Sequence, residues 1–331
     1  MSEPVQPFDP EVHHRTLHDG REDGLVPLET LDCDAVPDFD RMLEAMGRTA
    51  FGGRRMGDAA DVLTEMICDP ECSVVLTLSG AMTVAKMGLV ITEMVERGWV
   101  QAIVSTGALM THGLVELTGM EHYKAVSDVD DKELFEKGYN RVYDTYEMEK
   151  NLNDLQQVMA QVFNRMPTDR PWSSWHLCRE TGRMLRRPGV RGIMASCFEN
   201  NVPIYIPAFT DCELGLDMAA WMIQARRAKT GESIYEALGN LRSSYDPFLD
   251  LGHYARLVLD SPRMGIVTIG GGVPRNWAQQ APPFVDIVAH VAEAEMELQR
   301  RMTTGDAAGS AGLVLMPILL LLAQRRRDEL E

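Results

Sequence analysis

The stretch "SVVLTLSGAMTVAKMGLVITEMVERGWVQAIVSTGA", residues 73–108, decides the fold. It begins with an apolar, β-branched run that ends at the Ser-Gly pair 79–80, which is typical of a buried strand followed by a turn. Residues 83–98 then have the spacing of a helix that closes at Gly98. Residues 100–108 repeat the pattern of a strand and a turn. This order predicts a βαβ unit with parallel strands and a right-handed crossover.

The same alternation continues on both sides of this stretch. Further strands are expected at 202–209 ("VPIYIPAF") and 264–272 ("MGIVTIGGG"). Helices are expected within 38–50, 57–67, 149–163 and 213–228, where apolar residues recur at helical spacing. The chain therefore predicts an α/β protein with a doubly wound, mostly parallel sheet. Its 331 residues, 45% of them hydrophobic, are enough for one large domain with a sizeable core.

Charge and the chain ends narrow the classes of partner. A net charge of −17 argues against nucleic acid and suits a cationic ligand such as a polyamine or a basic peptide. The first 20 residues lack a basic-then-apolar signal pattern, so we expect a cytoplasmic protein with reduced cysteines. The apolar run from Ala311 to Ala323 has 13 residues, short of the ~20 that cross a bilayer, so no membrane partner is expected. Cys68 and Cys72 have no second pair at zinc-finger distance, and we expect no metal site.

Ligands of such sheets bind beyond the carboxyl ends of the strands, which here are followed by small and polar residues. These loops are 79–83, 105–108, 210–217 and 270–276. Neither a G-x-G-x-x-G fingerprint nor a P-loop is present. The three glycines at 270–272 could cradle a phosphate at a helix start or form a structural turn.

Two aspartates follow the strand expected at 202–209. Asp211 could bind ribose hydroxyls or cap the next helix, and Asp217 could hold an ammonium group. His112 and His176 are candidate acid–base groups, although a lone histidine is weak support for catalysis.

Taken together, the loops resemble those of the deoxyhypusine synthase family, and within it the prokaryotic deoxyhypusine synthase-like branch. The resemblance lies in "SGAMT" (79–83), "STGALMTHG" (105–113), "NRVYDTY" (140–146), "NVPIYIPAFTDCELGLDM" (201–218) and "GIVTIGGGVPRNW" (265–277), in the family's order. It implies a Rossmann-like domain at 37–280, preceded by an acidic leader at 1–36 and followed by a divergent tail at 281–331.

The resemblance also implies an activity. It is NAD-dependent transfer of the butylamine part of spermidine to an amine, either a protein lysine or a small polyamine, by a homotetramer. The positions that match NAD-contacting residues of the family are Ser79, Gly80, Ala81, Met82, Thr83, Thr106, Gly107, Ala108, His112, Asp211 and Gly271. The positions that match its amine-binding residues are Thr111, His112, Asp217 and Asn276.

Three departures set this chain apart from the eukaryotic enzyme. Thr111 and His112 replace two adjacent glutamates that hold the polyamine, and Asn276 replaces a histidine after the glycines. The S-W-G-K segment that supplies the imine-forming lysine has no match, because the last of the six lysines is Lys229. No catalytic residue is therefore assigned. The alternative is a catalytically inactive NAD- or polyamine-binding protein. A third possibility is an NAD-dependent deacylase or another unrelated α/β protein.

Overall fold

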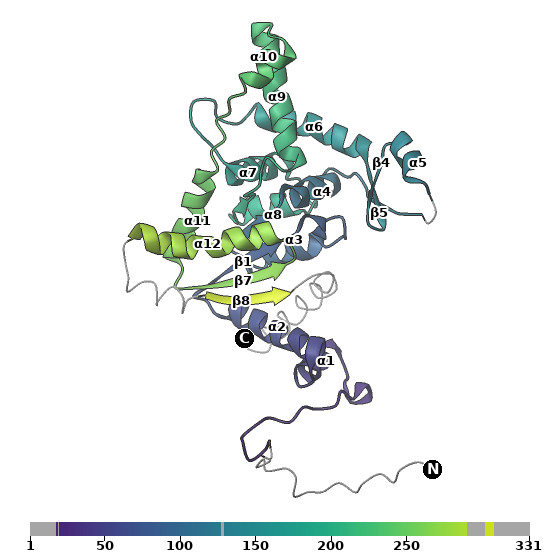
Figure 1. Cartoon of the computed structure of the whole chain (residues 1–331), viewed down its shortest axis with the longest axis vertical. Coiled ribbons are helices and arrows are strands. Elements are labelled where there is room, and N and C mark those ends of the chain that lie inside the picture. The colour runs from purple at the N-terminus through teal and green to yellow at the C-terminus, as the bar shows by residue number, and fades with distance from the viewer. Residues whose placement is uncertain (1–17, 19, 127–128, 290–301, 308–331) are drawn as a thin grey trace, which may run out of the picture. The chain divides into compact units, whose positions relative to one another are not determined.

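A five-stranded sheet forms the centre of residues 59–331, with its strands in the order β6-β2-β1-β7-β8 (Figure 1). The computed structural model of the chain describes residue 18 and residues 20–126, 129–289 and 302–307. Every pair of neighbouring strands is parallel, which confirms the predicted α/β fold. The strands are β1 (Cys72–Leu78), β2 (Ala102–Ser105), β6 (Ile204–Tyr205), β7 (Arg263–Ile269) and β8 (Met302–Ala307).

The two central strands explain why the sequence is apolar without alternation here. β1 pairs with β7 over its whole length, from Cys72 opposite Arg263 to Leu78 opposite Ile269. Most of their residues are buried, as expected for a parallel sheet covered on both faces. The hydroxyls of Thr77 and Thr268, which lie opposite each other, are satisfied by a mutual hydrogen bond of 2.9 Å.

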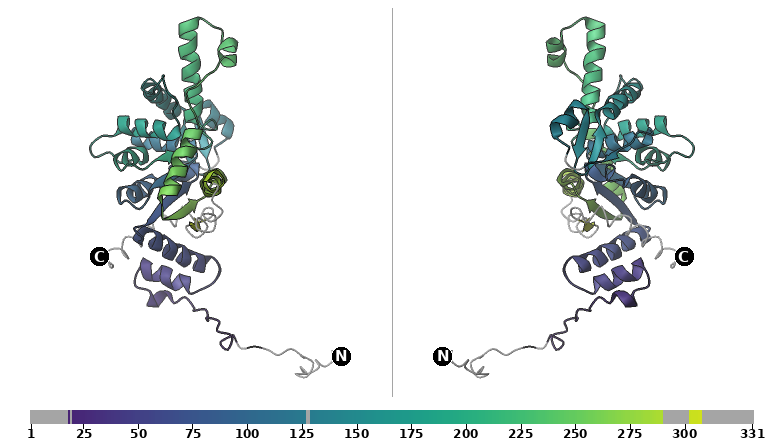
Figure 2. Two further views of the ribbon diagram at one scale, coloured as in Figure 1. Left: turned by 90° about the vertical axis from the view of Figure 1, so that its left-hand side faces the viewer. Right: turned by 90° about the vertical axis from the view of Figure 1, so that its right-hand side faces the viewer.

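Helices cover both faces of the sheet, so the sheet is doubly wound (Figure 2). On one face α11 (Phe248–Asp260) and α12 (Gly272–Ala289) pack on strand residues such as Val75, Val104 and Ile266. The opposite face is covered by α3 (Gly88–Glu96), α4 (Gly107–Leu117), α7 (Ser174–Leu185) and α8 (Ile193–Glu199).

The chain changes direction in the middle of the sheet. It passes from β1 through α3 to β2 and on to β6 at one edge, and it returns to place β7 on the other side of β1. The point where the order reverses lies between β1 and β7. In sheets of this kind the ligand crevice opens at such a point, beyond the carboxyl ends of the strands.

A second, three-stranded antiparallel sheet lies beyond the carboxyl ends of the strands of the main sheet (Figure 1). Its order is β3-β5-β4, and its strands are β3 (Tyr123–Lys124), β4 (Tyr139–Val142) and β5 (Thr145–Met148). The tight β4–β5 turn contains Tyr143 at a φ of 57°. The sequence analysis did not predict this sheet, although it drew on part of the same segment for the family resemblance.

The remaining elements are helical. Those in residues 59–331 are η3 (Gly80–Met82), α5 (Asp131–Glu136), α6 (Glu149–Phe163), α9 (Glu213–Thr230) and α10 (Ile234–Gly239). Residues 1–58 form a separate unit with η2 (Cys33–Ala35), α1 (Phe39–Gly47) and the start of α2 (Phe51–Cys68). The helices α4, α6 and α9 contact one another.

Two predicted elements differ from those observed. The strand expected at 202–209 is reduced to Ile204–Tyr205, because the flanking Pro203 and Pro207 lack the N–H groups that a longer ladder needs. The helix expected to start at residue 83 starts at Gly88. The chain before it forms η3 and a turn in which Lys86 has a φ of 63°, a value that interrupts a right-handed helix.

Residues beyond 280 contribute a part of one helix and one strand to the main sheet and its covering layer. α12 runs across residue 280 to Ala289, and β8 pairs with β7. The division at 36 and 280 stays a prediction from the family resemblance. The apolar run at 311–323 and half of the acidic leader, residues 1–17 and 19, lie outside the described residues. Within the described part of the chain, every helix is too short or too polar to cross a lipid bilayer.

Candidate functional site

The loops after β1 and β7 touch at the point where the sheet reverses. The backbone N–H of Ser79 donates to the carbonyl of Ile269 at 3.1 Å. Gly270 and Gly271 have φ values of 66° and 80°, which only glycine adopts readily. A Cβ on Gly270 would lie 3.2 Å from the Ser79 Oγ, and one on Gly271 would lie 3.4 Å from the Ser79 Cα. The glycines therefore allow both a tight turn and a close approach of the two loops.

The loops after β2 and β6 continue this line of contacts. A Cβ on Gly80 would lie 2.8 Å from the Oγ1 of Thr106, and one on Gly107 would lie only 2.0 Å from the Sγ of Cys212. The hydroxyl of Thr83 donates to the carbonyl of Leu109 at 3.1 Å. The structure thus brings the four loops singled out in the sequence together along one edge of the sheet.

Unused hydrogen-bonding groups collect at this edge. α4 begins at Gly107 and α12 at Gly272, so the first turns of two helices start in these loops. Thr106, at the N-cap of α4, makes no side-chain capping bond. Its buried Oγ1 has no hydrogen-bond partner among the described residues. Free backbone N–H groups at helix starts favour anions such as phosphate.

The other predicted cofactor residues lie in the same loops, with differing exposure. Asp211 is exposed, and Cys212 rather than Asp211 occupies the N-cap of α9. The capping alternative for Asp211 is therefore wrong, and its carboxylate stays available. Met82 is buried in η3, whereas Ala81 is exposed. Ala108 is half-buried and would contact a Cβ on Gly80.

The predicted amine-binding residues lie in different surroundings. Thr111 is buried, and its hydroxyl donates to the carbonyl of Gly107 at 3.2 Å, so it is engaged within α4. Asn276 is exposed on α12. His176 lies apart from the four loops, where it completes a capping box with Ser173 at the start of α7.

Asp217 is the predicted site residue with the most unusual environment. It lies on α9 with 2% of its surface exposed. Its Oδ1 accepts a hydrogen bond from the Gln156 Nε2 at 3.1 Å, while its Oδ2 has no partner among the described residues. Burial raises the pKa of Asp217 to about 6; the bond from Gln156 opposes this shift, and Glu213 adds to it. A cation brought to the Oδ2 would satisfy this carboxylate.

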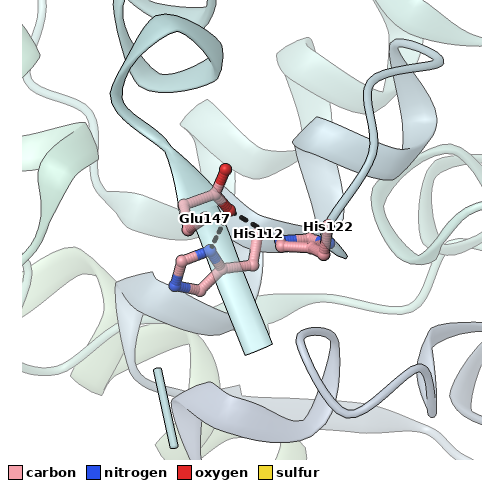
Figure 3. A group of neighbouring side chains, drawn as sticks. All are labelled: His112, His122 and Glu147. Atoms are coloured by element: carbon pink, nitrogen blue, oxygen red, sulfur yellow. Dashed lines mark hydrogen bonds and ion pairs between the residues drawn. The ribbon is translucent and has the colours of Figure 1, made fainter. Parts of the chain in front are cut away.

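A second polar group forms around His112, which lies five residues beyond the start of α4. Figure 3 shows the side chains of His112 and His122 pointing at one carboxylate, that of Glu147 on β5. The Glu147 Oε2 lies 2.9 Å from the His112 Nδ1 and 2.6 Å from the His122 Nε2. Burial would raise the pKa of Glu147, but the bonds to the two histidines and Asn151 outweigh it and lower the pKa to about 2.

Two of these three residues were missed by the sequence analysis. His112 was singled out, but His122 lies in the segment before β3 and Glu147 lies in a strand of the unpredicted small sheet. They are separated by 10 and 35 residues from His112, with no local spacing that would connect them. Only knowledge of the small sheet could have identified the group.

These features define an α/β protein with a candidate ligand site at the carboxyl edge of a parallel sheet. The chain belongs to the deoxyhypusine synthase family, whose sequence model, "Deoxyhypusine synthase", matches residues 41–311.

Two relatives illustrate the match. The chain is 32% identical over 254 residues to the "Deoxyhypusine synthase-like protein" of Chlorobaculum parvum, covering 75% of this chain and 68% of the relative. It is 30% identical over 235 residues to "Probable deoxyhypusine synthase 2" of Archaeoglobus fulgidus, covering 71% and 72%. A crystal structure of a candidate deoxyhypusine synthase from Entamoeba histolytica has the same fold, with a TM-score of 0.51, 18% identity and coverage of 74% and 82%.

Proposed function

We propose that the chain is an NAD-dependent aminobutyl transferase that moves the butylamine part of spermidine to an amine acceptor. The acceptor would be a protein lysine or a small polyamine, and diaminopropane would leave. The observation that carries the proposal is Asp217, a buried carboxylate whose Oδ2 lacks a partner among the described residues. An alkylammonium ion is the complement that such a group needs.

The loop edge fits a dinucleotide. Gly270 and Gly271 leave backbone open beside Ser79, and Thr106 holds an unused hydroxyl next to the start of α4. The exposed carboxylate of Asp211 suits a ribose hydroxyl. When bound there, the nicotinamide supplies reversible hydride acceptance, so the transfer is redox-neutral overall. The residues of this chain would orient the amine and exclude water.

The lysines favour a second candidate, a catalytically inactive NAD- or polyamine-binding protein. All six lysines of the chain are exposed, whereas a lysine that forms an imine is usually activated by desolvation or a cationic neighbour. Lys86 does contact the histidine group, but 53% of its side chain is exposed and it pairs with Glu116. If the chain is a transferase, the acceptor amine would have to form the imine with the butylamine fragment directly, in place of the family's lysine.

One assay separates the two candidates. Purified protein is incubated with NAD and labelled spermidine, and release of labelled diaminopropane is followed. Release supports the transferase. Binding of NAD without any release, even when lysine-containing proteins and putrescine are added as acceptors, supports the binding protein.

The cofactor residues are tested by calorimetry. Asp211→Ala is expected to abolish measurable NAD binding, because its carboxylate would hold the ribose. Asp260→Ala removes an exposed aspartate that precedes β7, at the opposite edge of the sheet, and is expected to leave NAD affinity unchanged. Unchanged affinity in Asp211→Ala would remove Asp211 from the site.

A further inference from the structure

The group of His112, His122 and Glu147 has the composition of a metal site. The three side chains come from α4, the segment before β3, and β5. One potential ligand atom of each lies within 4.8 Å of the other two. Their exposed fractions are 17%, 0% and 1%, so the group is shielded and open only beside His112.

We propose that the His112 Nδ1, the His122 Nε2 and the Glu147 Oε2 bind one divalent transition-metal ion, with Zn²⁺ as the best match. Two imidazoles and one carboxylate are a donor set that zinc uses in sites with an open fourth position. Ligand atoms around tetrahedral zinc lie about 3.3 Å apart. The present N···O separations of 2.9 and 2.6 Å would need to widen by less than about 1 Å.

Glu147 is held in the orientation that such a site requires. Its Oε1 accepts hydrogen bonds from the Asn151 Nδ2 and from the backbone N–H of Met148, both at 3.0 Å. These bonds fix the carboxylate plane and leave the Oε2 directed at the two imidazoles. Hydrogen bonds of this kind, outside the ligands themselves, position metal-binding carboxylates in known sites.

Two charged neighbours of His122 act on the site in opposite directions. The Lys86 Nζ lies 3.2 Å from the His122 Nδ1. An ammonium group can only donate, so this contact places the imidazole proton on the Nε2, where the metal would bind. The Glu116 Oε1 lies 3.9 Å from the same Nδ1 and favours a proton there, which leaves the Nε2 free. Lys86 should therefore weaken metal binding and Glu116 should strengthen it.

The proposal is tested with the full chain, stripped of metal by a chelator and titrated with Zn²⁺ in a calorimeter and with Co²⁺ in a spectrophotometer. We expect one equivalent of Zn²⁺ and the visible absorption bands of four-coordinate Co²⁺. Glu147→Gln and His122→Asn should each lower the affinity at least tenfold. His18→Asn is the control, because His18 also pairs with a carboxylate, Asp23, but is exposed.

Lys86→Met provides a test that does not depend on how well the buried variants fold, since Lys86 is exposed. We expect it to bind Zn²⁺ several-fold more tightly than the unaltered chain. Absence of stoichiometric binding in both the unaltered chain and Lys86→Met, with circular dichroism showing both folded, would overturn the proposal. So would undiminished binding in folded Glu147→Gln. The assay uses neither NAD nor spermidine, so its outcome is independent of the proposed transferase activity.

Discussion

Gly107 lies so close to Cys212 that a Cβ atom on the glycine would be 2.0 Å from the cysteine sulfur and 2.4 Å from its Cβ. This contact joins the loop after β2 to the turn that precedes α9. Both residues are buried, so neither has room to move aside.

Gly107→Ala is therefore expected to destabilise the protein by about 1–3 kcal/mol through overpacking. NAD affinity should fall as well, because the loops on either side of this contact would separate. Chemical denaturation and calorimetry measure the two effects. Gly252→Ala is the matched control, since Gly252 is exposed within α11 with nothing within 4 Å of the added Cβ. A neutral Gly107→Ala would contradict the observed contact.

Gly271→Ala separates backbone strain from crowding of the cofactor. Gly271 and Gly231 have φ values of 80° and 72°, so alanine at either should cost about 1–2 kcal/mol of stability. Only the Cβ at Gly271 would lie against Ser79, since Gly231 has open space around it. NAD binding should be lost in Gly271→Ala alone. Equal NAD affinity in the two variants would argue against a backbone cradle at Gly271.

Thr106→Val tests the unused hydroxyl at the start of α4. Because the Oγ1 has no partner among the described residues, its removal should leave stability unchanged or slightly higher. NAD affinity should fall about tenfold, the loss expected for one hydrogen bond. Thr83→Val is the comparison, because that hydroxyl donates to the Leu109 carbonyl and its loss should cost about 1 kcal/mol of stability. A stability loss in Thr106→Val without a change in binding would assign the hydroxyl a structural role.

Asp217 should make the free protein less stable as pH rises. Its pKa is about 6 in the folded chain and near its ordinary value of about 4 when unfolded. The folded state therefore holds the proton more tightly, and stability falls between about pH 4 and pH 6 by up to roughly 3 kcal/mol. Urea denaturation should show a smaller fall in Asp217→Asn than in the unaltered chain.

The same denaturation experiment in the presence of spermidine tests whether the ligand binds at Asp217. If an ammonium group of the ligand pairs with Asp217, it lowers the pKa of Asp217 in the folded state, so the fall in stability should become smaller when spermidine is present. Asp217→Asn should lack this change. Asp260→Asn, which changes an exposed carboxylate, should behave like the unaltered chain. An identical pH profile in Asp217→Asn and the unaltered chain would contradict the raised pKa.

The sequence was informative where apolar runs are long and end in small residues. β1 and β7 are such runs, and the glycines after them identify the loops that meet at the sheet edge. It was uninformative for the small sheet, because β4 is largely exposed and has no alternation of apolar and polar residues. The histidine–carboxylate group depends on that sheet, so its members could not be connected from spacing alone.

The helix α4 runs from the loops at the sheet edge to the group of His112, His122 and Glu147. Its first residue, Gly107, lies in the loops at the carboxyl edge of the sheet, and His112 lies about 7.5 Å further along the same helix axis. The two regions therefore share one continuous helix. Any coupling between a ligand at one end and an ion at the other would have to change both affinities by the same factor.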